Sequence, residues 1–350
     1  MLITFSYYAG ADVIFFLPET QFFNYFRSPN SVFAFGAVEA IVFSFALADK
    51  YDMMQKDITR VKIEKEQEKS EQLRKINIAS SKFVPSPFLN FLGKENILEA
   101  TLGDYVEKQV NVLFSDIRVY TSLSENMTPE DNFKFVNAFN LRMGPIIRNN
   151  KGFINQYLGD GIMAIFPEDT EDTLNAAIEM HKNLNEYNQR RLAKLKIPIR
   201  MGIGIHTGPL IMGIIGDEQR MDAATISDTV NVASRIEGLT KHFGASILVS
   251  EACVQNLKHK EKFNLRYLGL TKVKGKREEI KIYECFDGET QEIIELKRAT
   301  LKDFEVASQL YFDKSLEQSL SIFKNIVEIN PKDFAAKIFL DKVDESLKTK

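Results

Sequence analysis

The segment Val110-Asn-Val-Leu-Phe-Ser-Asp116-Ile117 is an apolar run that ends next to an aspartate. A second segment, Tyr157-Leu-Gly-Asp160-Gly-Ile-Met-Ala-Ile-Phe166, places another aspartate in a Gly-Asp-Gly turn of the kind that joins hairpin strands. Turn chemistry alone explains either aspartate taken singly. Taken together, two carboxylates at the tips of adjacent rigid strands can converge on hard divalent cations, which prefer oxygen ligands and act in pairs on phosphates.

A third segment, from Arg220 to Gly238, contains an amide and a guanidinium at helical spacing. Asn231 and Arg235 lie four residues apart on a predicted helix, so both project from one face. An amide and a guanidinium in this arrangement can hold a ribose and a phosphate. The three segments together therefore indicate a site for a phosphorylated nucleoside.

Apolar strands alternate with amphipathic helices through the middle of the chain, which predicts an α+β sandwich. The order fits a ferredoxin-like sheet with helices on one face. We predict strands at 110–115, 153–158, 162–166, 199–205, 210–215, 247–249, 265–273 and 280–285, and helices at 129–147, at 174–191 and from Asp228 onward.

The chain resembles the class III nucleotidyl cyclases, which make cyclic AMP or cyclic GMP from the nucleoside triphosphate. The resemblance covers Val106 to Phe286 and implies the ferredoxin-like cyclase sandwich. It depends on five motifs in family order, which are Phe114-Ser-Asp-Ile-Arg118, Leu158-Gly-Asp-Gly-Ile-Met-Ala-Ile-Phe166, Ile203-Gly-Ile-His-Thr-Gly208, Asp228-Thr-Val-Asn-Val-Ala-Ser-Arg235 and Val273-Lys-Gly-Lys276.

The resemblance implies that Asp116 and Asp160 bind two magnesium or manganese ions, with the backbone carbonyl of Ile117 as a further ligand. It also implies that Asn231 orients the ribose. Arg235 would stabilise charge on the α-phosphate as pyrophosphate leaves, a planar multi-donor task that suits arginine.

Two further residues are carried over as substrate-binding, Phe114 and Lys274. Lys274 matches a lysine that reaches the triphosphate, although its Lys-Gly-Lys loop is equally explained as a solvated basic turn. In the family the metal aspartates and the Asn–Arg helix come from opposite domains packed head to tail. Because this chain has one such domain with both sets, the resemblance implies a homodimer whose monomer is nearly inactive.

Three positions depart from the family pattern. Gln156 stands where adenylyl cyclases usually have Lys and guanylyl cyclases Glu, and Ala224 removes the second base contact. Since a glutamine amide offers both donors and an acceptor, it can face adenine or guanine, and the sequence leaves the choice between ATP and GTP open. Val119 replaces a usual glycine beside the triphosphate, and its β-branch restricts the backbone there.

The first 50 residues contain two apolar runs, Leu2 to Leu17 and Val32 to Ala48, each close to the roughly 20 residues that span a bilayer. A lysine-rich stretch follows, which agrees with the positive-inside rule. We therefore expect two transmembrane helices and a multi-pass membrane protein with a cytoplasmic catalytic domain. The alternative is a buried pair of core helices, which Asp12 and Glu39 favour.

The remaining segments flank the catalytic region. Residues 33–51 resemble the last helix of bacterial seven-helix receptors, which would make the chain a fragment of a longer protein. Residues 51–105 are predicted to form a helical linker that prolines interrupt at Pro85 and Pro87. Residues 289–350 resemble a tetratricopeptide-like helical pair, which cannot bury its apolar face without neighbours.

Composition limits the possible functions. The 350 residues have room for one catalytic domain and small accessories, and a net charge of -3 argues against a nucleic-acid partner. The two cysteines, Cys253 and Cys285, lie in apolar runs and are expected to be reduced. We therefore predict a cyclase domain at 106–288 that makes cyclic AMP from ATP in intracellular signalling. The alternatives are a guanylate cyclase and a degenerate module that binds nucleotide or only dimerises.

Overall fold

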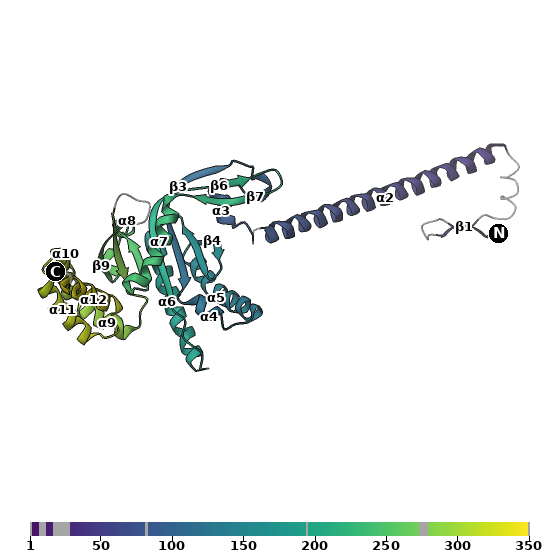
Figure 1. Cartoon of the computed structure of the whole chain (residues 1–350). Coiled ribbons are helices and arrows are strands. Elements are labelled where there is room, and N and C mark those ends of the chain that lie inside the picture. Colours follow the sequence, from purple (N-terminus) through teal and green to yellow (C-terminus); the bar gives the residue numbers. More distant parts are fainter. Residues whose placement is uncertain are drawn as a thin grey trace. The chain divides into compact units, whose positions relative to one another are not determined.

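The computed structural model of the chain describes residues 2–6, 12–16, 29–80, 83–193, 195–272 and 279–348. The chain divides into two compact units, Met1–Ser80 and Ser81–Lys350. Figure 1 shows the chain with most of its helices and several of its strands labelled. Each unit is described separately below.

The first unit consists of a small hairpin and one long helix. Strand β1 (Leu2–Ser6) pairs antiparallel with β2 (Asp12–Phe16), and α2 spans Pro29–Ser80. The predicted helix over Leu2 to Leu17 is therefore wrong for both described stretches. Their β-branched and aromatic side chains favour strands, and overall hydropathy does not distinguish a strand from a helix.

The second apolar run, Val32 to Ala48, is helical as part of α2. Among the helices that the structure describes, none combines the length and the apolarity that a bilayer crossing needs. Glu39 and Asp49 interrupt the apolar part of α2, and beyond them the helix is dominated by charged residues. The two predicted transmembrane helices are thus not supported.

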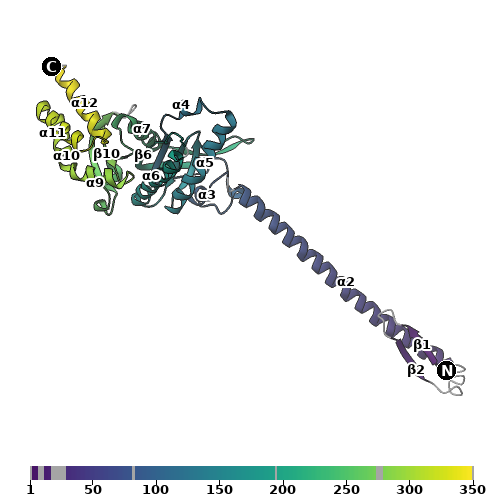
Figure 2. The same ribbon diagram turned by 90° about the horizontal axis from the view of Figure 1, so that it is seen from below.

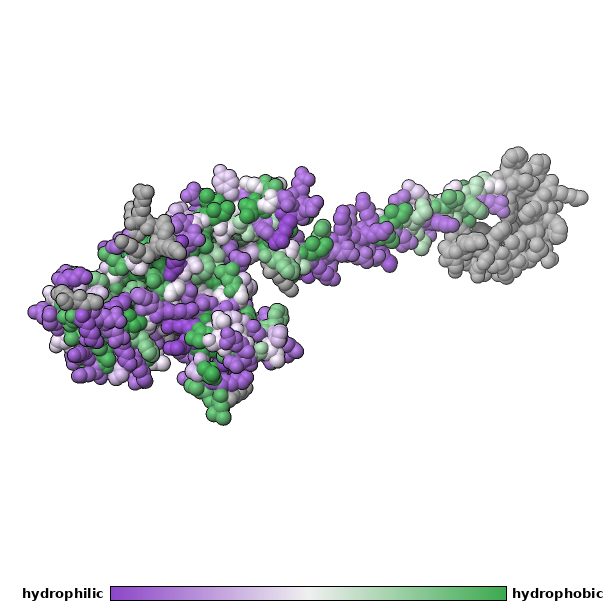
Figure 3. Space-filling view, viewed as in Figure 1, coloured by the Kyte–Doolittle hydropathy of each residue, from purple (hydrophilic) through white to green (hydrophobic). Residues whose placement is uncertain are grey.

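Side chains along the described part of α2 are largely exposed, and hydrophobic and hydrophilic residues are interspersed along it (Figure 3). Met54, Ile58 and Val61, which follow coiled-coil spacing, are exposed among them. Ion pairs one turn apart, such as Arg60–Glu64, lie on the same helix. Such exposed pairs add only about 0.3–0.5 kcal/mol each.

The second unit is built on an eight-stranded sheet in the order β4-β5-β3-β6-β8-β10-β9, with β7 paired to the outer part of β6. Its strands are β3 (Tyr105–Ile117), β4 (Phe153–Leu158), β5 (Gly161–Phe166), β6 (Met201–Gly216), β7 (Met221–Ile226), β8 (Ile247–Ser250), β9 (Leu265–Lys272) and β10 (Glu279–Cys285). Pairing is antiparallel except between β6 and β8.

Helices cover both faces of this sheet. On one face, α5 (Pro129–Asn149) and α6 (Thr170–Leu192) pack on alternate residues of β3 and β6, such as Leu113 and Ile203. On the other face, α7 (Asp228–Phe243) packs over β6, and α3 (Ser86–Phe91) joins it near Val112. Short helices complete the unit, namely η1 (Ile97–Glu99), α4 (Tyr120–Ser124), α8 (Glu251–Gln255) and η2 (Lys260–Lys262).

Three details differ from the predicted fold. Helices lie on both faces of the sheet, not one. The strands predicted at 199–205 and 210–215 form the single long strand β6, because Gly208 and Pro209 stay in register with β3. Strand β7 was not predicted, since 221–226 has little apolar alternation. Cys253 and Cys285 are free and buried, as predicted.

The C-terminal helices pack on α7 and on the sheet. They are α9 (Gln291–Ala299), α10 (Leu301–Phe312), α11 (Leu316–Ile329) and α12 (Phe334–Lys348). They gather near β9 (Figure 1) and β10 (Figure 2). Phe304, Phe323 and Phe339 share one apolar core with Val232 and Ile236 of α7. The helical tail therefore buries its apolar face against the cyclase-like region.

A buried ion network fixes the tail in place. Arg266 of β9 donates two hydrogen bonds of 2.7 Å to Asp333, just before α12, and it also pairs with Glu284 of β10. Lys297 of α9 completes the network at 2.7 Å from Glu284. All four side chains are almost entirely buried.

Substitution of Arg266 tests this network. We expect Arg266→Ala to lower the free energy of unfolding by about 3–5 kcal/mol, because two buried carboxylates would lose their main counter-charge. Lys281→Ala, which breaks an exposed ion pair with Glu251, serves as the control and should cost less than about 1 kcal/mol. Denaturant unfolding measures both. Equal losses in the two variants would show that the Arg266 network contributes no more than a surface pair.

Candidate active site

Two aspartates meet at one end of the central strands. Asp116 lies near the end of β3, and Asp160 lies in the turn between β4 and β5, which pairs with β3. Burial and the adjacent carboxyl of Asp116, which lies within hydrogen-bonding reach, raise the pKa of Asp160 to about 6. The backbone N–H of Ile117 donates to Asp160 and opposes this rise. The structure thus brings together the two carboxylates that the sequence singled out.

A third acidic side chain faces the pair from α7. Burial raises the pKa of Glu237 to about 7, with a further contribution from the charge of Asp116. The Glu237 Oε1 atom is buried without a hydrogen-bond partner, and Lys241, one turn later, places its Nζ 3.9 Å from Asp116 Oδ2. Sequence reasoning missed both residues. Their only signal was a Glu-to-Lys spacing of four, which usually marks a solvated helix face.

Two glycines of β6 allow α7 to lie this close. A Cβ atom on Gly204 would stand 2.1 Å from the backbone nitrogen of Glu237, and one on Gly202 would stand 2.3 Å from Thr240 Oγ1. Because real Cβ contacts are never that short, any other residue would push α7 away from the sheet. Gly202 of β6 is the cross-strand partner of Asp116 of β3. The close approach of α7 to β6 is therefore directly beside the carboxylates.

Asn231 and Arg235 point away from their own domain's carboxylates. The buried residues of α7, including Val232 and Ile236, face the sheet, while Asn231 is exposed and Arg235 half-buried. At 100° per residue, Asn231 lies about 150° and Arg235 about 110° around the helix from the centre of that buried stripe. Glu237 and Lys241 face Asp116 from the side of the helix. One copy therefore presents the acids and the Asn–Arg pair on separate surfaces.

The residues predicted to contact the base lie on neighbouring strands. Gln156 is exposed on β4, and Ala224 is half-buried on β7. The amide of Asn155, next to Gln156, donates to Thr225, next to Ala224, at 3.4 Å. The structure therefore brings the two positions near each other.

The other predicted substrate contacts differ in their surroundings. Phe114 is half-buried on β3 and packs against an apolar cluster that includes Met163 and Ala233. Lys274 lies outside the described residues. Val119 has the left-handed φ of 63°, a conformation that glycine adopts easily and a β-branched residue rarely does. Valine thus replaces the glycine that the family usually has at this position, and the backbone keeps the left-handed conformation that glycine adopts easily.

The donors at this site suit hard divalent cations. Two carboxylates converge beside the backbone of Ile117, and each added oxygen ligand favours magnesium or manganese over softer metals. Burial, and after it the neighbouring carboxyl of Asp116, disfavour the ionised form of Asp160, and a bound cation would offset both effects. Within the described ranges, no group of three His, Cys, Asp or Glu side chains forms a ready-made metal cage.

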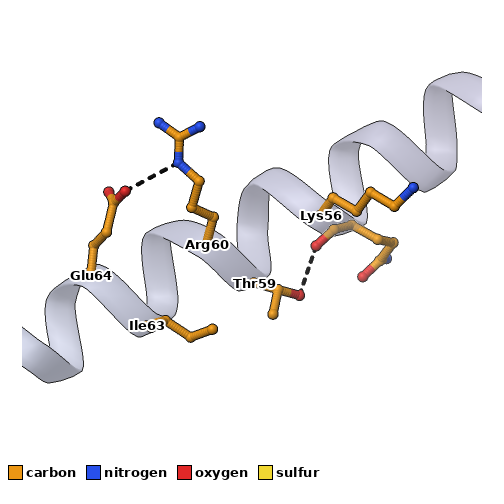
Figure 4. Close-up of a pocket in the computed structure, with 6 residues that line it drawn as sticks. Lys56, Thr59, Arg60, Ile63 and Glu64 are labelled. Carbon is orange, nitrogen blue, oxygen red and sulfur yellow. Dashed lines mark hydrogen bonds and ion pairs between the residues drawn. The ribbon is translucent and has the colours of Figure 1, made fainter.

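A shallow hollow elsewhere lies along α2 and is not a comparable site. Figure 4 shows it lined by residues such as Lys56, Thr59 and Ile63, all from one exposed helix. The Arg60–Glu64 pair and the Thr59 hydroxyl bonded to the preceding turn already satisfy the polar groups there. All residues that line this hollow belong to α2, so a ligand there would contact only one helix.

The region with this site matches a known catalytic family. Residues 104–285 match the adenylate and guanylate cyclase catalytic domain, and the chain belongs to that family. The matched range contains the acids, the Asn–Arg helix and the Lys274-Gly-Lys276 sequence.

Individual relatives agree with this assignment. An adenylate cyclase of Anabaena cylindrica is 43% identical over 218 residues, which covers 61% of this chain and 43% of the relative. The terminal-differentiation-specific adenylate cyclase of Dictyostelium discoideum is 34% identical over 277 residues, which covers 77% of this chain and 13% of the relative. The chain thus matches less than half the length of either protein.

A solved structure supports the fold. The structure of a bacterial light-regulated adenylyl cyclase aligns with a TM-score of 0.55 at 21% identity, over 68% of this chain and 70% of that one. The α+β cyclase fold predicted from the motifs is therefore confirmed for this region.

The burial of Asp160 beside Asp116 predicts a pH-dependent stability in metal-free protein. Since folding raises the pKa of Asp160 from 3.8 to about 6, its contribution to stability is present below pH 3.8 and is lost as the pH rises through 6. We therefore expect Asp160→Asn to stabilise the metal-free fold at pH 8 by about 1 kcal/mol, a value reduced for solvent screening, and to change it little near pH 4.

Thermal unfolding in a chelator at both pH values measures this effect. Glu186→Gln on the exposed side of α6 is the matched control and should show no such pH difference. Destabilisation of Asp160→Asn at pH 8 would contradict a raised pKa of Asp160 in the folded protein.

Proposed function

We propose that the chain is an adenylate cyclase that converts ATP to 3′,5′-cyclic AMP and pyrophosphate at the interface of a homodimer, in intracellular signal transduction. The observation that supports this most is the separation of two complementary surfaces on one domain. Asp116 and Asp160 form one surface, and Asn231 and Arg235 form the other on the far side of α7. Two copies packed head to tail would join the acids of one to the Asn–Arg pair of its partner, twice.

Each set has a distinct task in this proposal. Asp116, Asp160 and the carbonyl of Ile117 would hold two magnesium or manganese ions, which supply Lewis acidity toward the ribose 3′-hydroxyl and the triphosphate. Asn231 from the second copy fixes the ribose so that its hydroxyl faces the α-phosphorus. Arg235 places its guanidinium donors where negative charge develops on the α-phosphate and the leaving pyrophosphate.

Base choice favours adenine in this proposal, because the relatives above with the higher identities are adenylate cyclases. Receptor-type and other guanylate cyclases match at 29% and 28% identity. Gln156 can present either hydrogen-bonding pattern by turning its amide, and Ala224 makes no polar contact with a base. Guanylate cyclase activity is therefore the second candidate, and cyclic GMP as the dominant product would establish it.

A non-enzymatic module that binds nucleotide or only dimerises is the candidate from a different class. The retained acids and the retained Asn231 and Arg235 favour the enzyme. The β-branched Val119 at a glycine-type conformation favours the module, because it restricts the backbone beside the acids. Absence of turnover with both triphosphates and both metals, together with retained nucleotide binding, would establish the module.

Mixing two inactive variants tests the shared site. We expect Asp116→Asn and Arg235→Ala each to lose at least about 100-fold in turnover alone, because each removes one half of every site. When the two are co-expressed, half of a random mixture is heterodimer with one complete site. Activity should then recover to about a quarter of the wild-type level. The assay measures cyclic nucleotide and pyrophosphate with ATP and with GTP.

The control is co-expression of Asp116→Asn with Asp160→Asn, which alter the same surface and should not restore activity. Recovery in this control pair equal to that in the first pair would contradict a site built from two copies.

Three predictions concern the flanking segments and remain predictions. They are a membrane location with a cytoplasmic catalytic domain, the likeness of residues 33–51 to a seven-helix receptor, and the tetratricopeptide-like character of the tail. Fractionation of cells expressing the full chain tests the first. Release of the chain by salt or alkaline carbonate would contradict an integral membrane protein.

A further inference from the structure

The turn that joins α6 to β6 exposes three large apolar side chains. Leu195 is 98% exposed, Ile197 72% and Leu192 56%. In Figure 3, hydrophobic side chains gather where Figure 1 shows α6 ending. Residues 190–193 and 195–198 form this part of the structure, the α6 turn.

Hydrogen bonds hold the backbone of the α6 turn in one conformation. The N–H of Leu195 donates to the carbonyl of Leu192 at 2.9 Å, and the N–H of Lys196 donates to Arg191 at 2.9 Å. This pair of bonds is the Schellman motif that closes many helices. The buried Arg191 side chain also donates from Nε to the carbonyl of Ile197 at 2.8 Å. A fixed turn therefore presents the apolar side chains.

Leu195 occupies the position of this motif that glycine favours. Its φ is 55°, in the left-handed region. A Cβ atom disfavours that conformation, so glycine is the usual residue there and asparagine an occasional one. The leucine side chain also buries almost nothing. Neither the backbone nor the packing of the domain thus explains a leucine at this position.

The α6 turn is also basic. The sequence of residues 189–200 is Gln-Arg-Arg-Leu-Ala-Lys-Leu-Lys-Ile-Pro-Ile-Arg, which has cations at 190, 191, 194, 196 and 200 and no acid. The side chains of Arg190 and Lys196 are exposed. The preceding acid along α6 is Glu186, which lies six residues before Leu192.

The acids of the neighbouring helix α5 are engaged within that helix. α5 packs on this end of α6, where the Arg191 guanidinium lies 5.7 Å from the Phe135 ring. The acids of α5 are Glu130 and Asp131, in its first turn. Glu130 pairs with Lys134, and Asp131 accepts a hydrogen bond from the threonine that caps the helix. The α6 turn therefore keeps an excess of positive charge.

We propose that the α6 turn binds the surface of a membrane that contains anionic lipids. Leu195 and its two apolar neighbours enter the boundary between the headgroups and the acyl chains, and the adjacent cations contact the headgroups. Because the turn is already fixed, little backbone freedom is lost on binding. This contact is peripheral and needs no transmembrane helix.

The size and charge of the patch favour a bilayer over a protein partner. A stable protein interface buries about 800 Å² on each partner and is depleted in lysine, whereas this patch has three apolar side chains among cations. The proposed homodimer uses α7, and α6 packs on the opposite face of the sheet. Membrane binding and dimerisation therefore use different surfaces, and the proposal does not depend on the cyclase function.

An environment-sensitive fluorophore on the α6 turn tests this proposal in the full chain. Ala193→Cys provides an exposed thiol for the label, while Cys253 and Cys285 are buried. We expect the emission to shift to the blue with vesicles of phosphatidylcholine and phosphatidylserine but not with phosphatidylcholine alone, and salt should weaken the response. The same label on Lys182→Cys, about three turns earlier on α6, is the control and should stay in water.

Leu195→Gly separates membrane binding from folding. Since glycine suits the left-handed φ, this variant should unfold at the same temperature as the wild type or higher. Its vesicle affinity, read from the label on Ala193→Cys, should nevertheless fall about tenfold or more. Leu141→Ala, which removes an exposed leucine of α5, is the matched control and should leave the affinity unchanged.

The charge contribution is measured with Lys196→Gln. We expect vesicle affinity to fall about fivefold, because one cation near the anionic surface is lost. Lys182→Gln, which changes an exposed lysine away from the turn, should have no effect.

Three results would overturn the proposal. The first is a label on Ala193→Cys that stays in water with anionic vesicles, which would leave the patch to a protein partner. The second is an equal loss of affinity in Leu195→Gly and Leu141→Ala. The third is a lower unfolding temperature for Leu195→Gly, because the leucine would then serve the fold. The label reports on the α6 turn itself, so membrane contacts elsewhere in the chain do not affect the reading.

Discussion

The close approach of α7 to β6 at Gly202 and Gly204 is the constraint on which the rest of the site depends. It places Glu237 and Lys241 beside Asp116, and it turns Asn231 and Arg235 toward the opposite side of the helix. A bulkier residue at either glycine would lift the helix and alter both surfaces together. One packing contact therefore positions Glu237 and Lys241 beside Asp116 and also orients the residues offered to a second copy.

Ionisable groups with shifted pKa values lie together near the end of β3. Asp160 and Glu237 both have pKa values raised by burial and by neighbouring acid, while Arg118 has its pKa lowered by burial and by Arg200. Acids and bases thus form separate groups, with Lys241 between them. Such segregation is costly in an empty protein and suits a ligand that has cations at one end and anions at the other. A metal-bound polyphosphate has this character.

The sequence predicted those parts of the fold that local chemistry determines. The Gly-Asp-Gly sequence around Asp160 is a short-range signal for a hairpin. The spacing of four residues between Asn231 and Arg235 is a short-range signal for the helix from Asp228. The helix over residues 2–17 was wrong because apolarity alone does not select a helix, and β6 was split because glycine and proline usually end strands. Glu237 and Lys241 were missed because only the tertiary position of α7 turns an ordinary surface pair toward the carboxylates.

The buried ion network joins the cyclase region and the C-terminal tail, so neither part is structurally independent of the other. A cut after residue 285, where the match to the cyclase catalytic domain ends, separates Arg266 and Glu284 from Asp333 and Lys297. Such a fragment would keep the Arg266–Glu284 ion pair, but that pair would lie in apolar surface that the tail no longer covers. The side of α7 that packs against the tail would also be exposed to solvent. Selection would then favour keeping the cyclase region and the tail in one gene, because each part alone would leave buried charged side chains without their partners.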